Sequence, residues 1–264
     1  MEKQKTVLLF GAGRVSLPVA KFFATRPDIH LMIATEFEDQ AQQLMKEMEG
    51  RSSYHPFRFP QDLSKLPELI KSSDIVISLL PATMHVPLAA EAVKQRRHMV
   101  TASYVSPDMK NLHQQASQEG VILLNEIGLD PGIDHMMIMQ AIDHIKSKGG
   151  KVRELVSLCG GLPDPVAAEN PLRYKFSWSP RGVLNAANNS AQYLAQGKIV
   201  QVKGDDLLRS TQPSNRFPTL RLEVVPNRDS LVYRDFYNVP DVHSICRGTL
   251  RYEGKRSMLS CHVL

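Results

Sequence analysis

Apolar and polar residues alternate in blocks through the first half of the chain. Short apolar runs predict the buried strands of a parallel sheet, and they occupy residues 6–10, 29–34, 74–80, 98–102 and 121–124. Segments with helical spacing separate these runs, at residues 14–24, 37–49, 84–95 and 107–118. A weaker strand around residues 54–59 contains Pro56, which favours an edge position. The alternation predicts an open α/β sheet with right-handed crossovers.

The pattern changes after about residue 130. We expect a helix around residues 136–142 and another near 181–195, with strands at 151–158, 199–203, 220–225 and 245–252. We interpret these residues as a second domain with mixed rather than purely parallel strand pairing. The expected fold is therefore α/β, with a doubly wound parallel sheet in residues 1–130. A second, mixed α/β domain follows in residues 131–264.

A glycine turn follows the first expected strand, with the sequence Gly11-Ala12-Gly13-Arg14-Val15. In a Rossmann-type domain the first glycine makes the turn and the second lets the backbone approach a pyrophosphate at the helix N-terminus. Ser16 occupies the place of a third glycine, where a small side chain is tolerated. Glu36, just after the second strand, is placed to bind a ribose. These features favour dinucleotide binding over a plain glycine-containing turn.

Two other nucleotide-dependent classes fit the turn less well. The first strand carries no acidic residue of the kind usual in S-adenosylmethionine methyltransferases. No Gly-Lys-Ser/Thr follows the glycines, which excludes a phosphate-binding P-loop.

The composition narrows the function classes further. Hydrophobic residues make up 42% of the chain and charged ones 22%, as in ordinary globular proteins. No apolar run approaches the roughly 20 residues of a membrane-spanning helix, and the start of the chain does not resemble a secretory signal. The net charge of +5 is spread along the chain. A concentrated basic stripe is typical of nucleic-acid binding, so we expect no nucleic-acid partner, and the charge suits an anionic cofactor and substrate.

Cysteine and histidine usage argues against a metal site. Cys159, Cys246 and Cys261 are too few and too scattered for a disulfide framework or a zinc site, which favours a reducing, cytoplasmic compartment. His135 and His144 are nine residues apart and are expected on different faces of their helix. We expect no bound metal.

Several longer motifs carry a family resemblance. They are VTASYVSP, GLDPGIDHM, CGGLPDP, NPLRYKFSWSP, PNRDS and RGTLRY. The chain resembles the saccharopine dehydrogenase family of the L-glutamate-forming type, and in particular the C-terminal half of aminoadipic semialdehyde synthases. The resemblance runs from Val7 to about Glu253 and includes a GxGxxS/T turn with a proline two residues on. Family members continue past RGTLRY, so we expect the C-terminal part of the second domain to be missing and an exposed apolar patch to favour a homodimer or aggregation.

The resemblance implies oxidative cleavage of saccharopine, a small-molecule substrate, to L-glutamate and 2-aminoadipate 6-semialdehyde in lysine metabolism. Two alternatives stay open. One is a related reductase that acts on another carboxylated amine, of the carboxynorspermidine type. The other is a dinucleotide-binding protein without catalytic activity.

The resemblance also implies the residues of the active site. The saccharopine contacts are Ser103, Tyr104, Arg228, Thr249, Leu250 and Arg251, and arginine suits carboxylates because its guanidinium can bind them bidentately. Arg173 and Lys175 are further candidates. For proton handling we expect Asp130 and Tyr104, followed by Cys159. The alternatives are that Asp130 only caps the helix after Pro131 and that Cys159 is only a small buried residue.

The cofactor contacts are implied in the same way. Beyond the glycine turn they are Glu36, Gln40, Leu80, Val100, Ala102, Leu129, Asp130 and Pro131. Glu36 predicts NAD rather than NADP, because a carboxylate accepts hydrogen bonds from ribose hydroxyls and repels a 2′-phosphate. Family members that use NADP carry arginine at this position. Glu38 and Asp39 follow closely and are also acidic, and the alternative for Glu36 is a solvated side chain at a helix start.

Overall fold

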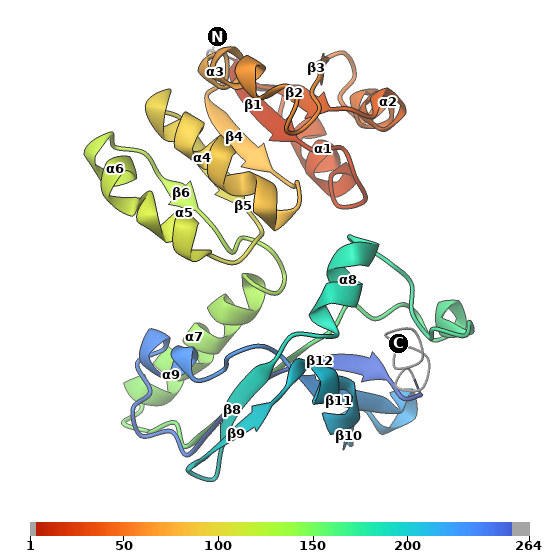
Figure 1. Ribbon diagram of the computed structural model, residues 1–264, viewed down its shortest axis with the longest axis vertical. Helices are drawn as coiled ribbons and strands as arrows, with labels where there is room; N and C mark the ends of the chain where they lie inside the picture. Colours follow the sequence, from red (N-terminus) through yellow and green to blue (C-terminus); the bar gives the residue numbers. More distant parts are fainter. Residues whose placement is uncertain (1–3, 255–264) are drawn as a thin grey trace. The chain divides into compact units, whose positions relative to one another are not determined.

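A computed structural model describes residues 4–254 of the chain (Figure 1). These residues form two compact units, which divide between Ile133 and Asp134. Cys261 lies outside the described residues. In residues 4–254 no helix is long and apolar enough to cross a membrane, and no group of His, Cys, Asp and Glu side chains could hold a metal ion.

The first unit is built on a six-stranded parallel sheet with the strand order β3-β2-β1-β4-β5-β6. Its strands are β1 (Lys5–Phe10), β2 (Ile29–Thr35), β3 (Ser52–Pro56), β4 (Ile75–Ser78), β5 (His98–Thr101) and β6 (Leu123–Leu124). This is the order of a doubly wound dinucleotide-binding sheet, which reverses direction beside β1. The predicted parallel sheet is confirmed, with the Pro56 strand at its edge.

Helices cover both faces of this sheet. They are α1 (Leu17–Ala24), α2 (Glu38–Glu47), α3 (Leu66–Lys71), α4 (His85–Lys94), α5 (Pro107–Asn111) and α6 (His113–Gln118). Side chains alternate between the two faces of a strand, so Leu8 and Phe10 pack in one core with α3, α4 and α5. Val7 and Leu9 pack in the opposite core with α1 and α2. Both faces of β1 are therefore buried, as its continuous apolar run indicates.

The second unit has a mixed sheet around its longest strand, β12 (Ser244–Tyr252). The other strands are β7 (Glu154–Cys159), β8 (Ala191–Ala195), β9 (Lys198–Val202), β10 (Gln212–Ser214) and β11 (Leu222–Pro226). β12 pairs in parallel with β7 and antiparallel with β11 and β8. Its helices are α7 (Ile133–Ser147), α8 (Pro180–Ala186) and α9 (Val232–Phe236). The predicted mixed pairing is confirmed.

The helix expected near residues 181–195 is wrong in its second half. α8 ends at Ala186, and β8 begins five residues later. Between them lies Asn188-Asn189-Ser190, whose side chains compete with helical hydrogen bonds and favour turns. β8 then forms a hairpin with β9 through Gln196 and Gly197, both with positive φ, which is the geometry that two-residue hairpins favour.

A buried ion pair joins α7 to β12. Arg247 Nη2 donates to Asp134 Oδ2 at 2.5 Å, and the two side chains are 2% and 7% exposed. Arg247 Nη1 also donates to the Tyr233 hydroxyl at 2.7 Å, and the guanidinium lies 4.6 Å from the centre of that ring. Two opposite charges with several hydrogen bonds offset the cost of their burial, whereas one alone would not.

Removing the carboxylate of this pair tests its contribution to stability. We expect Asp134→Asn to lower the free energy of unfolding by about 3 to 5 kcal/mol, because the Arg247 charge stays buried without its counter-charge. Urea unfolding followed by the fluorescence of Trp178, the single tryptophan and a residue of the second unit, measures the change. Asp143→Asn, at an exposed position of the same helix, is the control. A loss below about 1 kcal/mol for Asp134→Asn, the range of surface ion pairs, would contradict the expectation.

Candidate active site

The glycine turn follows β1 as predicted and leaves room for a ligand. Gly11 has a φ of 95°, in the left-handed region that glycine adopts without strain, and a Cβ there would lie 3.4 Å from the backbone of Leu79. A Cβ at Gly13 would meet nothing within 4 Å, so its backbone is open to an approaching group. These two positions fit a pyrophosphate at the start of α1.

Ser16 has a role that the sequence does not reveal. Its side chain is fully buried, and its hydroxyl donates to the Gly11 carbonyl oxygen at 2.9 Å. The hydroxyl therefore closes the turn between β1 and α1 from inside. Ala12 is buried beside it, whereas Arg14 and Val15 are exposed.

Glu36 lies between the end of β2 and the start of α2, outside the helix. Its carboxylate pairs with an arginine that sequence reasoning missed: Arg58 Nε donates to Glu36 Oε2 at 2.9 Å. Arg58 follows β3, which pairs with β2 in the register Thr35 to Pro56. This register is the signal that could have found Arg58, since it brings the residues after both strands together.

The remaining expected cofactor residues lie at or near the ends of strands. Leu80 follows β4, and its Cδ2 atom would lie 3.4 Å from a Cβ at Gly11. Val100 belongs to β5, Ala102 follows it, and Gln40 lies in the first turns of α2. The carboxyl ends of parallel strands meet at one edge of a sheet, where ligands of such folds bind.

Tyr104 and Asp130 are brought together by the loop that carries the motif GLDPG. The Tyr104 hydroxyl donates to Asp130 Oδ1 at 2.9 Å. The loop folds back on itself through a hydrogen bond from the Gly128 amide to the Pro131 carbonyl oxygen, 2.9 Å long. Gly132 has a φ of 150°, and a Cβ there would overlap the Gly128 carbonyl oxygen. Only glycine fits, and the fold leaves Leu129 58% exposed at the tip and Pro131 buried.

A buried histidine ties these strand ends together and was also missed. His85, the first residue of α4, is 2% exposed. Its Nδ1 lies 2.9 Å from the Ser78 hydroxyl, and its Nε2 lies 2.8 Å from that of Ser103 and 3.0 Å from that of Thr101. Burial lowers the pKa of His85 from 6.5 to about 4, so the ring is neutral at pH 7. The neutral ring holds the Ser103 hydroxyl beside Tyr104.

In the second unit three expected residues share one face of the sheet. Thr249 and Arg251 alternate with buried residues along β12, and Cys159 of β7 is the register partner of Thr249. Arg247 lies on this same face of β12. Leu250 points to the opposite face and packs with Leu222 and other residues of the core. Its side chain is therefore part of the core.

The guanidinium of Arg251 is largely buried and incompletely hydrogen-bonded within residues 4–254. Its Nη1 is buried, and the described part of the chain offers it no hydrogen-bond partner. Burial lowers the pKa of the guanidinium from its usual 12.5, while the nearby Tyr174 acts in the opposite direction. An arginine nevertheless keeps its charge in proteins, so a carboxylate at Nη1 would supply the missing acceptor. Arg228, by contrast, is exposed and has a φ of 53°.

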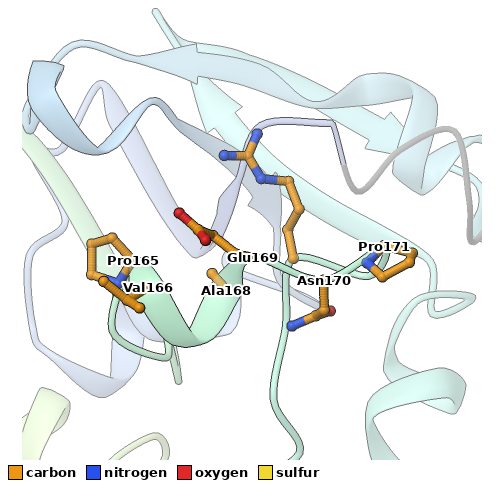
Figure 2. A pocket seen from close by; sticks show the side chains of 7 residues that line it. Pro165, Val166, Ala168, Glu169, Asn170 and Pro171 are labelled. Carbon is orange, nitrogen blue, oxygen red and sulfur yellow. The ribbon is translucent and has the colours of Figure 1, made fainter.

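An open hollow of about 610 Å³ lies in the second unit after the motif CGGLPDP (Figure 2). Its lining residues are Pro165, Val166, Ala168, Glu169, Asn170, Pro171 and Arg173. Arg173 is engaged there, because its Nη1 donates to the Glu253 carbonyl oxygen at 2.9 Å. Lys175 is exposed nearby in the sequence. Of the candidates above, only Arg173 lines this hollow.

Comparisons with known proteins match both units. The saccharopine dehydrogenase NADP binding domain matches residues 7–124, and the saccharopine dehydrogenase C-terminal domain matches residues 128–264. The alpha-aminoadipic semialdehyde synthase, mitochondrial, of Mus musculus is 42% identical over the whole chain and 28% of its own length. The saccharopine dehydrogenase [NADP(+), L-glutamate-forming] of Saccharomyces cerevisiae is 40% identical over 95% of the chain and 55% of its own length.

A solved structure shows the same fold. The apo histidine-tagged saccharopine dehydrogenase (L-Glu forming) from Saccharomyces cerevisiae matches with a TM-score of 0.86 and 40% identity, over 97% of this chain and 57% of that one. The chain thus spans little more than half the length of this relative, and less of the mouse protein. With both domain models and these relatives matched along its length, the chain belongs to the saccharopine dehydrogenase family.

Proposed function

We propose that this protein catalyses the oxidative cleavage of saccharopine to L-glutamate and 2-aminoadipate 6-semialdehyde, a step of lysine metabolism, with NAD as its preferred cofactor. The observation that carries the proposal is the family match of both units, since the yeast relative with this activity in its name is similar along almost the entire chain. The two domain assignments, a dinucleotide-binding first unit and a substrate-binding second unit, belong to the same proposal.

The nicotinamide, when bound, supplies the acceptor for a hydride from the carbon beside the saccharopine nitrogen. The carbon–nitrogen bond becomes an imine, water adds to that carbon, and the carbinolamine breaks into an amine and an aldehyde. The residues of the protein hold the carboxylates and move protons. In this proposal the Arg251 guanidinium, whose Nη1 has no hydrogen-bond partner among residues 4–254, binds a substrate carboxylate, with Arg228 and Thr249 as further contacts.

Tyr104 and Asp130 serve the proton transfers. The Tyr104 hydroxyl donates to Asp130, so a proton that leaves the amine or the attacking water can pass along this bond. His85 fixes the adjacent Ser103 hydroxyl without carrying a charge that would compete with the substrate ammonium. Cys159 is a third candidate, on the sheet face that Thr249 and Arg251 share.

Two observations bear on the choice of cofactor in opposite directions. The Glu36 carboxylate would accept hydrogen bonds from the ribose hydroxyls of NAD and repel the 2′-phosphate of NADP. The name of the yeast relative specifies NADP(+). Our proposal of NAD rests on Glu36. A cytoplasmic location and a homodimer are predictions from the sequence, and the name of the mouse relative includes the word mitochondrial.

Turnover of saccharopine by the purified chain tests the function. We expect reduced nicotinamide to accumulate, measured by its absorbance, with kcat/KM for NAD+ at least tenfold above that for NADP+, which needs about 1.4 kcal/mol of discrimination. Turnover only with a shorter carboxylated amine would favour the carboxynorspermidine-type reductase. Dinucleotide binding without turnover of any such amine would favour the non-catalytic protein.

The proton-transfer pair has its own test. We expect Asp130→Asn and Tyr104→Phe each to lower kcat by about 10²- to 10⁴-fold, the usual contribution of a positioned acid or base. For Tyr104→Phe, NAD+ affinity measured by calorimetry should change less than about threefold, because Tyr104 is not among the expected cofactor contacts. Asp108→Asn, at an exposed position of α5, is the matched control. Unchanged kcat in both variants would remove the pair from the mechanism.

Acid should weaken the first unit through His85. Because burial lowers the pKa of His85 to about 4, the unfolded chain binds the proton more tightly. Above about pH 6.5 the neutral His85 ring does not reduce the stability of the folded unit. Between pH 6.5 and 4 the free energy of unfolding falls by about 3 kcal/mol in total, because the unfolded chain takes up the proton first. Chemical unfolding followed by circular dichroism at several pH values measures this.

A matched pair of variants isolates that contribution. We expect His85→Asn to reduce the slope of stability against pH in this interval, while His113→Asn, at an exposed position of α6, leaves it as in the wild type. Equal slopes in the wild type and His85→Asn would show that His85 does not set the acid sensitivity.

A further inference from the structure

A basic side chain stands at the position where the cofactor ribose is expected. Arg58 and Glu36 form an ion pair at the carboxyl ends of β3 and β2, with side chains 65% and 37% exposed. The hydrogen bond between them runs from Arg58 Nε to Glu36 Oε2 and is 2.9 Å long. Among residues 4–254, Glu36 is the side-chain partner of the Arg58 guanidinium, and this bond uses one of its five N–H donors.

The backbone on both sides holds Arg58 in place. Phe57, just before it, is buried against Phe10 at 5.1 Å between ring centres, and its amide donates to the Thr35 carbonyl oxygen at 3.0 Å. The Arg58 amide donates to Asp62 Oδ2 at 2.7 Å. Asp62 is itself paired with Lys65 at 2.9 Å. The guanidinium therefore extends from a fixed point beside Glu36.

We propose that Arg58 is a second selectivity residue, which binds the 2′-phosphate of NADP when the Glu36 carboxylate releases it. This inference rests on the proposed dinucleotide site. With NAD, the Glu36 carboxylate accepts hydrogen bonds from the ribose hydroxyls and stays paired with Arg58. With NADP, the doubly charged phosphate competes for the same guanidinium, whose remaining donors suit a phosphate.

The chain therefore discriminates against NADP less strongly than a lone glutamate would. Glu36 repels the phosphate, and Arg58, on the neighbouring strand end, attracts it. Selectivity is then a property of the pair. The yeast relative is named for NADP(+), and in this chain an arginine stands beside the glutamate at the expected ribose position.

Calorimetric binding of NAD+ and NADP+ without substrate tests the inference. We expect Arg58→Gln to weaken NADP+ binding at least tenfold and to change NAD+ binding less than threefold. Glu36→Gln should tighten NADP+ binding at least tenfold, and adding Arg58→Gln in that background should reverse the gain. In the Glu36→Gln background, Arg58→Lys should give an NADP+ affinity between those with arginine and with glutamine at position 58. The increase in NADP+ affinity caused by Glu36→Gln should become smaller as salt is added, because positions 36 and 58 are exposed.

Lys46→Gln controls for the loss of a positive charge, because Lys46 is an exposed residue of α2 in the same unit, and we expect it to change neither affinity more than threefold. If NAD+ binds and Arg58→Gln weakens both dinucleotides equally, or neither, the role of Arg58 is overturned while the proposed function stands. If the wild type binds neither dinucleotide, the proposed function fails, and this inference with it.

Discussion

The parallel hydrogen bonding of β1 to both β2 and β4 is the constraint on which the candidate site depends. Because the strand order reverses at β1, the connections from β1 and β4 leave on opposite sides of the sheet, and in folds of this kind ligands bind at the carboxyl edge beside that reversal. Glu36, Gly11 and Leu80 follow the neighbouring strands β2, β1 and β4 at that edge. None of them lies close to the others in sequence, and each is held there by a strand whose two faces are buried.

Beyond β5 the same edge is extended by polar contacts. His85 links the hydroxyls at the ends of β4 and β5, and the loop closed by Gly128 and Gly132 lays Asp130 on the Tyr104 hydroxyl. In the second unit β12 carries the candidate residues Thr249 and Arg251. The buried ion pair between Arg247 of β12 and Asp134 of α7 holds this strand in place. Positioning depends on buried polar pairs in both units, where one missing partner is costly.

Much of the first unit and part of its site could be predicted from residues alone. Apolar runs of β-branched and aliphatic residues gave the strands β1, β2, β4 and β5 within a few residues, because both faces of a central parallel strand are buried and leave a continuous signal. The second unit was harder, since half-buried antiparallel strands such as β8, with the sequence AQYLA, have weak patterns. There the turn residues, rather than the hydrophobic period, mark the end of α8.

The sequence by itself determined the family, the glycine turn, the acidic residue after β2, and the Tyr104 and Asp130 candidates, because these are local motifs at fixed spacing. Only the tertiary structure decided which distant residues meet: Arg58 with Glu36, and His85 with Ser103. It also decided that Ser16 closes its turn from inside and that Leu250 faces the core. The physical reason is that register and strand order, which are set by long-range pairing, choose the partner of each polar side chain.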